Sequence, residues 1–417
     1  MRLLIKNIKE LVQVETSDYK IRVEGKKMSE IQTIKNAFLY IEDEKISSFG
    51  KMDDLKSKNI NYSVLSKEID ASGRMVFPSY CDSHTHLIYS GSREREFIDK
   101  INGLTYEEIA KRGGGILNSA MKLHDTSDEV LLEESQQRLE EIIKYGTGAV
   151  EIKSGYGLTV KDEIKMLRVI KKLKSISPLK IKSTFLGAHA LPLEYKDNRK
   201  GYIDLIINRM LPQIAGEGLA DYCDVFCDKG FFTIEETDKI LKEAAKYGMK
   251  AKLHVNELDN SGGVQVGVKN NALSVDHLER IDVEEIKVLK NKNTMPTLLP
   301  TAAFFLNLPY PPARKMIDSG LGVALASDFN PGSSPSGNMQ LVSSLACIKL
   351  RMNPEEVINA STINSAYAMD LSKDYGSIAV GKKANIFITT KMNSYPFLQY
   401  SFGSNNVETV ILDGKLV

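Results

Sequence analysis

Residues 233–257, TIEETDKILKEAAKYGMKAKLHVNE, contain one helix followed directly by one strand, and this unit indicates the fold. Thr233 and Glu236 have the spacing of a capping box, which predicts the start of a helix. We expect that helix to end at Gly248, because glycine commonly follows the last helical turn. The strand KAKLHVNE comes next and carries His254 near its end, with Glu257 three residues later.

The same alternation runs through the chain from about residue 78 onward. Residues 127–146 have apolar side chains at helical spacing and stop at Gly146, and the strand-like TGAVEIKSGYG follows. Comparable helix starts precede the strand-like TMPTLLPT and GVALASD, and a final helix opens at Asn353, Pro354 and Glu356. Alternation of this kind implies a parallel sheet with helical crossovers. Its extent, roughly 300 residues, favours a closed (β/α)₈ barrel over residues 78–375.

The two ends of the chain have a different pattern. Residues 1–77 and 376–417 hold short strand-like runs, among them NAFLYIEDEKISSFG, ANIFITT and a VETVILDGKLV run with an Asp413-Gly414 hairpin turn. Neither piece has enough apolar surface for a core of its own. We therefore predict one small composite β-sandwich domain built from both termini.

Composition narrows the function classes. The 417 residues carry a net charge of +1, which gives no electrostatic reason to expect nucleic acid or an anionic membrane as partner. No apolar run is long enough to span a bilayer, and the charged N-terminus does not resemble a signal peptide. Four cysteines in so long a chain favour a reducing compartment, so we expect a cytoplasmic protein acting on a small molecule.

Histidines and one aspartate gather at the ends of the predicted strands. In FPSYCDSHTH, residues 77–86, His84 and His86 are two apart, which places both imidazoles on one side of a strand. His254 and His277 end two later strands, and Asp328 ends another. The carboxyl ends of all strands in a parallel barrel share one face, where active sites lie. Imidazole and carboxylate together are the ligands of a metal hydrolase.

Other polar residues follow strand ends and are candidates for substrate contacts. Arg93 lies just beyond the HTH motif, and a guanidinium group is suited to bidentate hydrogen bonding with a carboxylate. Tyr156 follows the strand that ends near Lys153, a lysine to which the pattern assigns no role. The loop DFNPGSSPSG begins at Asp328, and its backbone donors and Asn330 are suited to hold a polar substrate group.

These motifs carry a resemblance to a known family. The HTH after a strand, the HxxE, a later histidine and a final strand-end aspartate resemble the amidohydrolase superfamily. The finer motifs are similar to those of its imidazolonepropionase family, and the similarity covers nearly the whole chain. Those motifs are GSREREF, RGGGI, EIKSGYGL, FLGAHALPLEY, DVFCDKGFF, SVDHLER and SDFNPGSSPS.

The resemblance implies a metal-bearing (β/α)₈ barrel that hydrolyses 4-imidazolone-5-propanoate to N-formimidoyl-L-glutamate in histidine degradation. It also implies roles for individual residues and a homodimer. The implied metal ligands are His84, His86, His254 and Asp328. The implied substrate contacts are Arg93, Tyr156, His189, Glu257, Asn330, Gly332 and Ser333.

We expect one divalent metal per subunit, zinc or alternatively iron, since histidine and carboxylate ligands suit both. Asp328 is expected to serve as the base, His277 to orient the water or stabilise the oxyanion, and Glu257 to contact a ring nitrogen. One rival hypothesis is a mononuclear amidohydrolase that deaminates a nitrogen heterocycle. Another is a non-catalytic scaffold that kept the barrel, although such scaffolds tend to lose metal ligands.

Overall fold

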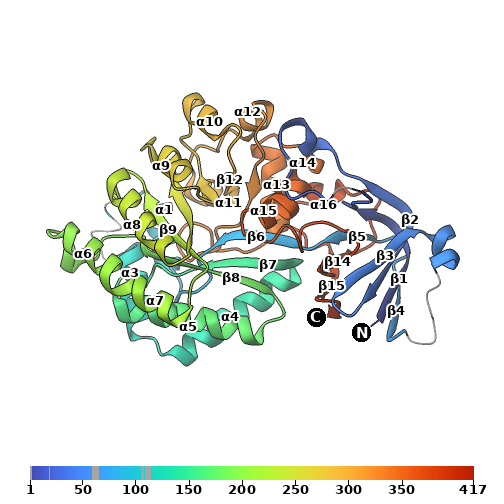
Figure 1. Ribbon diagram of the computed structural model, residues 1–417, viewed down its shortest axis with the longest axis horizontal. Coiled ribbons are helices and arrows are strands. Elements are labelled where there is room, and N and C mark those ends of the chain that lie inside the picture. Colours follow the sequence, from blue (N-terminus) through green and yellow to red (C-terminus); the bar gives the residue numbers. More distant parts are fainter. Residues whose placement is uncertain (1, 18, 59–64, 105–107, 109–113) are drawn as a thin grey trace.

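The computed structural model describes residues 2–17, 19–58, 65–104, 108 and 114–417 (Figure 1). Arg112 and Gly113 of the RGGGI motif lie outside the described residues. Figure 1 shows a barrel surrounded by helices, with a sheet at one side that contains both chain ends.

The barrel sheet has eight parallel strands in sequential order, as the alternation of helices and strands predicts. Each strand pairs with its neighbours in the chain, and each is buried along most of its length because helices cover the outer face. The strands are β6 (Tyr80–Thr85), β7 (Thr147–Lys153), β8 (Lys180–Ala188), β9 (Tyr222–Cys227), β10 (Lys250–Val255), β11 (Ser274–His277), β12 (Met295–Leu298) and β13 (Ala324–Leu325).

The barrel is nearly closed by contacts between β6 and the segment that follows β13. The Asp328 amide donates to the His84 carbonyl at 3.0 Å. The buried Asp82 carboxylate accepts from both the amide and the hydroxyl of Ser327, at 3.0 and 2.5 Å. The strand expected over residues 322–328 is therefore reduced to Ala324–Leu325, because a side chain rather than a strand partner takes the Ser327 amide.

The helix starts that the sequence predicts near residues 128, 234, 283 and 354 are present. The capping box of Thr233 and Glu236 is present, and Asp282 and Asn353 also cap helices with their side chains. The helices that line the barrel or its upper face are α1 (Glu94–Ile101), α3 (Ile116–Asp125), α4 (Asp128–Lys144), α5 (Val160–Ile176), α6 (Arg199–Leu205), α7 (Leu211–Glu217), α8 (Ile234–Lys246), α9 (Gly263–Lys269), α10 (Val283–Leu289), α11 (Pro300–Leu306) and α12 (Ala313–Asp318). The chain then continues through α13 (Met339–Lys349), α14 (Pro354–Asn359), α15 (Ser365–Tyr367) and α16 (Phe397–Tyr400).

Both termini build one further β-structure, as predicted, and its eight strands belong to a single mixed sheet. β14 is its junction, since it pairs with β5 on one side and with β15 on the other. The strands are β1 (Arg2–Val12), β2 (Thr33–Glu42), β3 (Lys45–Lys51), β4 (Lys67–Asp70), β5 (Met75–Pro78), β14 (Ile386–Thr389), β15 (Val407–Leu412) and β16 (Lys415–Leu416).

The two terminal pieces share their apolar core. One apolar cluster joins N-terminal residues such as Leu3 and Ile41 to C-terminal ones such as Ile386 and Ile411. The sheet also packs on the barrel, where Phe387 on β14 stacks on Tyr80 of β6 with ring centroids 5.2 Å apart. The terminal sheet thus depends on both ends of the chain and is anchored to the start of β6.

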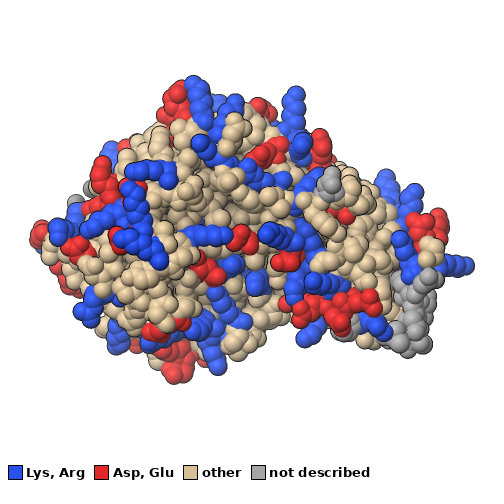
Figure 2. All heavy atoms as spheres, in the orientation of Figure 1, with Lys and Arg blue, Asp and Glu red and all other residues tan. Residues whose placement is uncertain are grey.

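The surface does not concentrate one charge sign on the face that Figure 2 shows. Basic and acidic side chains are interspersed there, in line with the net charge of +1 (Figure 2). Among the described residues, no helix is both long and apolar enough to cross a membrane.

Candidate active site

Six side chains with metal-binding or proton-transfer chemistry meet at the carboxyl ends of the barrel strands. His84 lies on β6 with His86 just after it, His254 on β10, and His277 at the end of β11. Asp328 lies three residues beyond β13, and Glu257 two residues beyond β10. His277 and Asp328 have positive φ angles of 84° and 54°, a sparsely populated conformation for residues other than glycine. Such strain occurs preferentially at functional sites.

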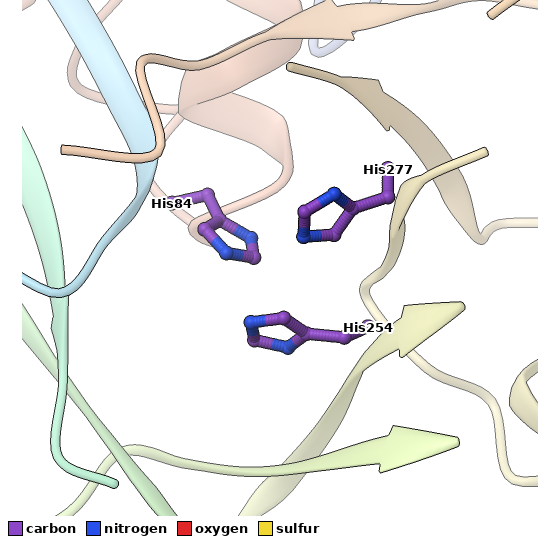
Figure 3. Close-up of side chains that lie close together, drawn as sticks. All are labelled: His84, His254 and His277. Atoms are coloured by element: carbon purple, nitrogen blue, oxygen red, sulfur yellow. The ribbon is translucent and has the colours of Figure 1, made fainter. Parts of the chain in front are cut away.

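The histidines approach one another closely enough to share an ion. Figure 3 shows the rings of His84, His254 and His277 pointing toward a common centre from three different strands. His86 Nε2 lies 3.1 Å from His254 Nε2. Asp328 Oδ1 lies 3.5 Å from His84 Nε2 and 3.6 Å from His86 Nε2. Three overlapping groups of possible ligands follow from these distances, and they are His84–His254–His277, His86–His189–His254 and His84–His86–Asp328.

The residues fit a divalent metal. His84 Nε2 and His86 Nδ1 are buried and have no hydrogen-bond partner within the described parts of the chain. Buried polar atoms are nearly always paired, so such atoms indicate an ion or ligand. Burial holds the pKa values of both imidazoles well below their ordinary value, which favours the neutral form that binds metals.

Two carboxylates behind the cluster fix the orientation of its imidazoles. Asp276 Oδ2 lies 2.6 Å from His84 Nδ1, and Asp224 Oδ1 lies 3.1 Å from His254 Nδ1. If each Nδ1 carries the proton and donates it, each Nε2 presents a lone pair to the centre. This carboxylate–histidine arrangement is the usual support of a metal-binding histidine.

His277 faces two buried glutamates. Its Nδ1 lies 3.7 Å from an oxygen of Glu257 and 3.7 Å from one of Glu279. Burial lowers the pKa of His277, but the two carboxylates outweigh it and raise the pKa to about 10. Burial raises the pKa of Glu257 to about 7, with His277 acting in the opposite direction. This pair can hold or transfer a proton near neutral pH.

The loop after Asp328 is folded by its own side chains. Asn330 Oδ1 accepts from the amides of Gly332 and Ser333 at 2.7 and 2.8 Å, and its Nδ2 donates to the Asp328 carbonyl at 2.6 Å. The Ser333 hydroxyl donates to Asp328 Oδ2 at 3.0 Å. Asn330 therefore shapes the loop, and Ser333 holds one oxygen of the Asp328 carboxylate.

A cavity of about 250 Å³ opens over this cluster. All residues that were expected to contact substrate line this cavity, together with most of the expected metal ligands. The lining residues are His86, Arg93, Glu96, Lys100, Ile116, Tyr156, His189, Phe226, Phe231, His254, Glu257, Leu258, His277, Leu306, Asp328, Asn330, Gly332 and Ser333.

Arg93 supplies positive charge to one wall of the cavity. Its Nε donates to the Ser119 hydroxyl at 2.9 Å, while its Nη2 is buried without a hydrogen-bond partner in the described chain. The guanidinium lies 5.6 Å from the centre of the Tyr156 ring. A β-carbon at position 332 would lie 2.1 Å from Arg93 Nη1, so any other residue there would displace the guanidinium from its present position.

His189 lies beside the candidate metal ligands His86 and His254. Its ring stacks on that of His86, with centroids 5.0 Å apart. Its Nδ1 is 3.0 Å from the carbonyl oxygen of Gly155, which leaves Nε2 for a ligand. His124, which the strand-end pattern does not include, is half-exposed on α3 and pairs with Asp162 at 2.8 Å.

Several site residues were not identified from the sequence. Asp224 and Asp276 lie inside the motifs DVFCDKGFF and SVDHLER, but the local pattern does not show that they face histidines on other strands. Glu96 and Lys100 line the cavity from α1, one and two helical turns beyond Arg93. Their spacing of about one turn is a signal that could have found them.

Comparisons with known proteins agree with this geometry. A model of the amidohydrolase family matches residues 75–417. An imidazolonepropionase from Christiangramia forsetii is 57% identical over 100% of both chains, and one from Flavobacterium johnsoniae is 58% identical over 99% of both. An imidazolonepropionase from Thermoanaerobacter pseudethanolicus is 44% identical over 93% of this chain and 91% of its own.

Solved structures with little sequence identity share the fold. An atrazine chlorohydrolase from Arthrobacter aurescens in complex with zinc matches with a TM-score of 0.69 at 15% identity, over 99% of this chain and 94% of that one. An adenosine deaminase from Xanthomonas campestris with bound zinc matches with a TM-score of 0.71 at 14% identity, over 99% and 92%.

Proposed function

The chain belongs to the amidohydrolase family, within which its relatives are imidazolonepropionases, and we propose from this premise that it hydrolyses 4-imidazolone-5-propanoate to N-formimidoyl-L-glutamate. This reaction opens a cyclic amide in histidine degradation. The observation that carries the proposal is one cavity that joins a histidine–aspartate cluster to Arg93, whose buried Nη2 has no hydrogen-bond partner among the described residues. The substrate has both matching parts, an amide carbonyl and a carboxylate.

His84, His86, His254 and Asp328 would hold one divalent metal, for which zinc is our first choice and iron the alternative. When bound, the metal would supply Lewis acidity, polarising the amide carbonyl and lowering the pKa of a water at the site. A second metal bridged by a carboxylated lysine does not suit this chain. The strand-end Lys153 has its Nζ 2.8 Å from both Glu151 and Asp224, where a carbamate anion would meet two carboxylates.

Asp328 is placed to move the proton of the attacking water. One carboxylate oxygen faces the histidines, and the other accepts a hydrogen bond from Ser333. We assign to this carboxylate the removal of the water proton and its delivery to the ring nitrogen as the C–N bond breaks. The new C–O bond leaves a second carboxylate on the product.

His277 and Glu257 are the other two residues to which we assign hydrogen-bonding roles in the reaction. The carboxylates of Glu257 and Glu279 keep His277 protonated, so it can donate to the oxygen that gains negative charge during attack. Glu257 lies beside it on the cavity wall, where it can accept a hydrogen bond from a ring N–H of the substrate.

Arg93 would bind the propionate of the substrate. Lys100 adds a second cation to the same wall, where its Nζ donates to the Gly332 carbonyl at 3.2 Å. The aromatic ring of Tyr156 lies against the guanidinium and narrows this end of the cavity. With the carboxylate of Glu96 on the same wall, Arg93 and Lys100 leave a net positive charge there, which favours an anionic substrate over a neutral heterocycle.

Replacing Arg93 with methionine should raise KM roughly 10- to 100-fold, since a hydrogen bond to a charged group contributes about 1.5–3 kcal/mol. We expect a much smaller change in kcat. Arg95→Met is the matched control, because Arg95 is exposed on the same helix. An Arg93→Met enzyme with the KM of the wild type would remove the carboxylate role from Arg93.

The reaction is tested by its product and its selectivity. Purified enzyme should convert 4-imidazolone-5-propanoate to a product heavier by one water, without releasing ammonia. The neutral propionamide analogue should be a much poorer substrate. Release of ammonia from a panel of nitrogen heterocycles, with no turnover of the imidazolone, would instead favour a deaminase.

A further inference from the structure

Among the described residues, one group of five fully buried charged side chains lies inside the barrel behind the histidine cluster, apart from Asp82, which binds Ser327. Two are lysines and three are carboxylates, so one negative charge is in excess. They are Glu151 and Lys153 on β7, Asp224 on β9, Lys252 on β10 and Asp276 on β11. Burial of an unpaired charge costs free energy, so ion pairs and hydrogen bonds must offset the desolvation of each of these groups.

Lys153 lies at the centre of this group. Its Nζ donates to Glu151 Oε1 and to Asp224 Oδ2, each at 2.8 Å, and lies 3.9 Å from Asp276 Oδ2. Asp224 and Asp276 are the two carboxylates that hold His254 and His84. One ammonium group therefore connects the supports of two candidate metal ligands on different strands.

The other buried lysine has a different environment. Lys252 Nζ donates to the backbone carbonyls of Ser83 and Ala368, at 3.0 and 3.2 Å. It also lies 3.9 Å from Asp276, but no carboxylate is within hydrogen-bond distance of it in the described chain. Lys252 thus ties backbone segments together, whereas Lys153 binds side chains that act on the cluster.

We propose that Lys153 is a positioning residue for the metal centre, whose ammonium group holds Asp224 and Asp276 so that His254 and His84 present their Nε2 atoms to one ion. This inference rests on the metal site of the proposed function. Without the ammonium, the carboxylates of Glu151 and Asp224 would repel each other across a space with no cation. Asp224 would move away, and His254 would lose its fixed ring orientation.

The test measures metal binding rather than activity. Apoenzyme is titrated with Zn²⁺ against a chromophoric chelator, and the visible spectrum of the Co²⁺-loaded protein reports the ligand geometry. Lys153→Met should weaken Zn²⁺ binding about 10- to 100-fold, the usual effect of losing a group that supports a metal ligand, and should alter the Co²⁺ spectrum. Lys382→Met is the control, because Lys382 is also buried but donates to Ser372 and Ser377 away from the cluster.

A second variant covers the case in which Lys153→Met does not fold. Lys153→Met combined with Glu151→Gln removes one cation and one anion together, so the net charge of the buried group is unchanged. We expect this protein to fold and still to bind Zn²⁺ about 10- to 100-fold more weakly than the wild type. Folded variants with wild-type Zn²⁺ affinity and an unchanged Co²⁺ spectrum would overturn the role of Lys153. Wild-type protein that binds no Zn²⁺ would overturn the metal site itself.

Discussion

Asp328→Asn should lower kcat by about 10³-fold or more while leaving much of the metal bound. The carboxylate is both a candidate ligand and the proposed carrier of the water proton, and general base catalysis alone contributes about 10²- to 10⁴-fold. Asparagine keeps one oxygen for the metal but cannot accept the proton. It also tolerates the left-handed backbone of this position, where φ is 54°.

Metal content by elemental analysis and kcat together decide this prediction. Asp370→Asn is the control, since that carboxylate is exposed and pairs with Lys250 on the surface. An Asp328→Asn enzyme that retains its metal and turns over at the wild-type rate would show that another group takes the proton. Glu257 would then be the next candidate, because burial raises its pKa to about 7.

His277→Asn should lower kcat by about 10²- to 10³-fold, the usual cost of removing a donor to a developing oxyanion. Asparagine suits the positive φ of 84° but is too short to reach the position of the imidazole ring. Because His277 is not one of the proposed ligands, we expect the affinity for Zn²⁺ to change little. The loss should therefore appear in kcat and not in metal content.

His124→Asn is the matched control for this variant, because His124 is half-exposed on α3 and pairs with Asp162. A His277→Asn enzyme with lost metal and proportionally lost activity would assign His277 to the ion instead of the substrate. The grouping of His277 with His84 and His254 makes this a real alternative outcome.

The sequence predicts much of the fold because its signals are local. Capping residues, glycine stops and apolar runs each act within one turn or strand, so the alternation of helices and strands can be read directly. A shared β-domain built from both termini was also expected, as a small β-sandwich. The arrangement of its strands in one mixed sheet was not, since it depends on β14 pairing with β5 on one side and β15 on the other.

The residues at strand ends were predicted as a site for a simple geometric reason. Parallel strands place their carboxyl ends on one face, so residues such as His86 and Asp328 meet there although they are far apart in sequence. The buried carboxylates that orient the histidines of this site were not predicted. Contact between Asp276 on β11 and His84 on β6 crosses the barrel interior, and no spacing along the chain encodes which strands face each other there. For the same reason, Lys153 had no role until its partners were known.

The central claim is that this enzyme opens the imidazolone ring by means of a metal held at the barrel mouth. The most direct test follows the ultraviolet absorbance of 4-imidazolone-5-propanoate with purified enzyme, with chelated enzyme, and with chelated enzyme after Zn²⁺ is restored. We predict conversion to N-formimidoyl-L-glutamate, its loss on chelation and its return in proportion to bound metal. Fully loaded enzyme that leaves the imidazolone unchanged, or metal-free enzyme that converts it at the full rate, would contradict the account.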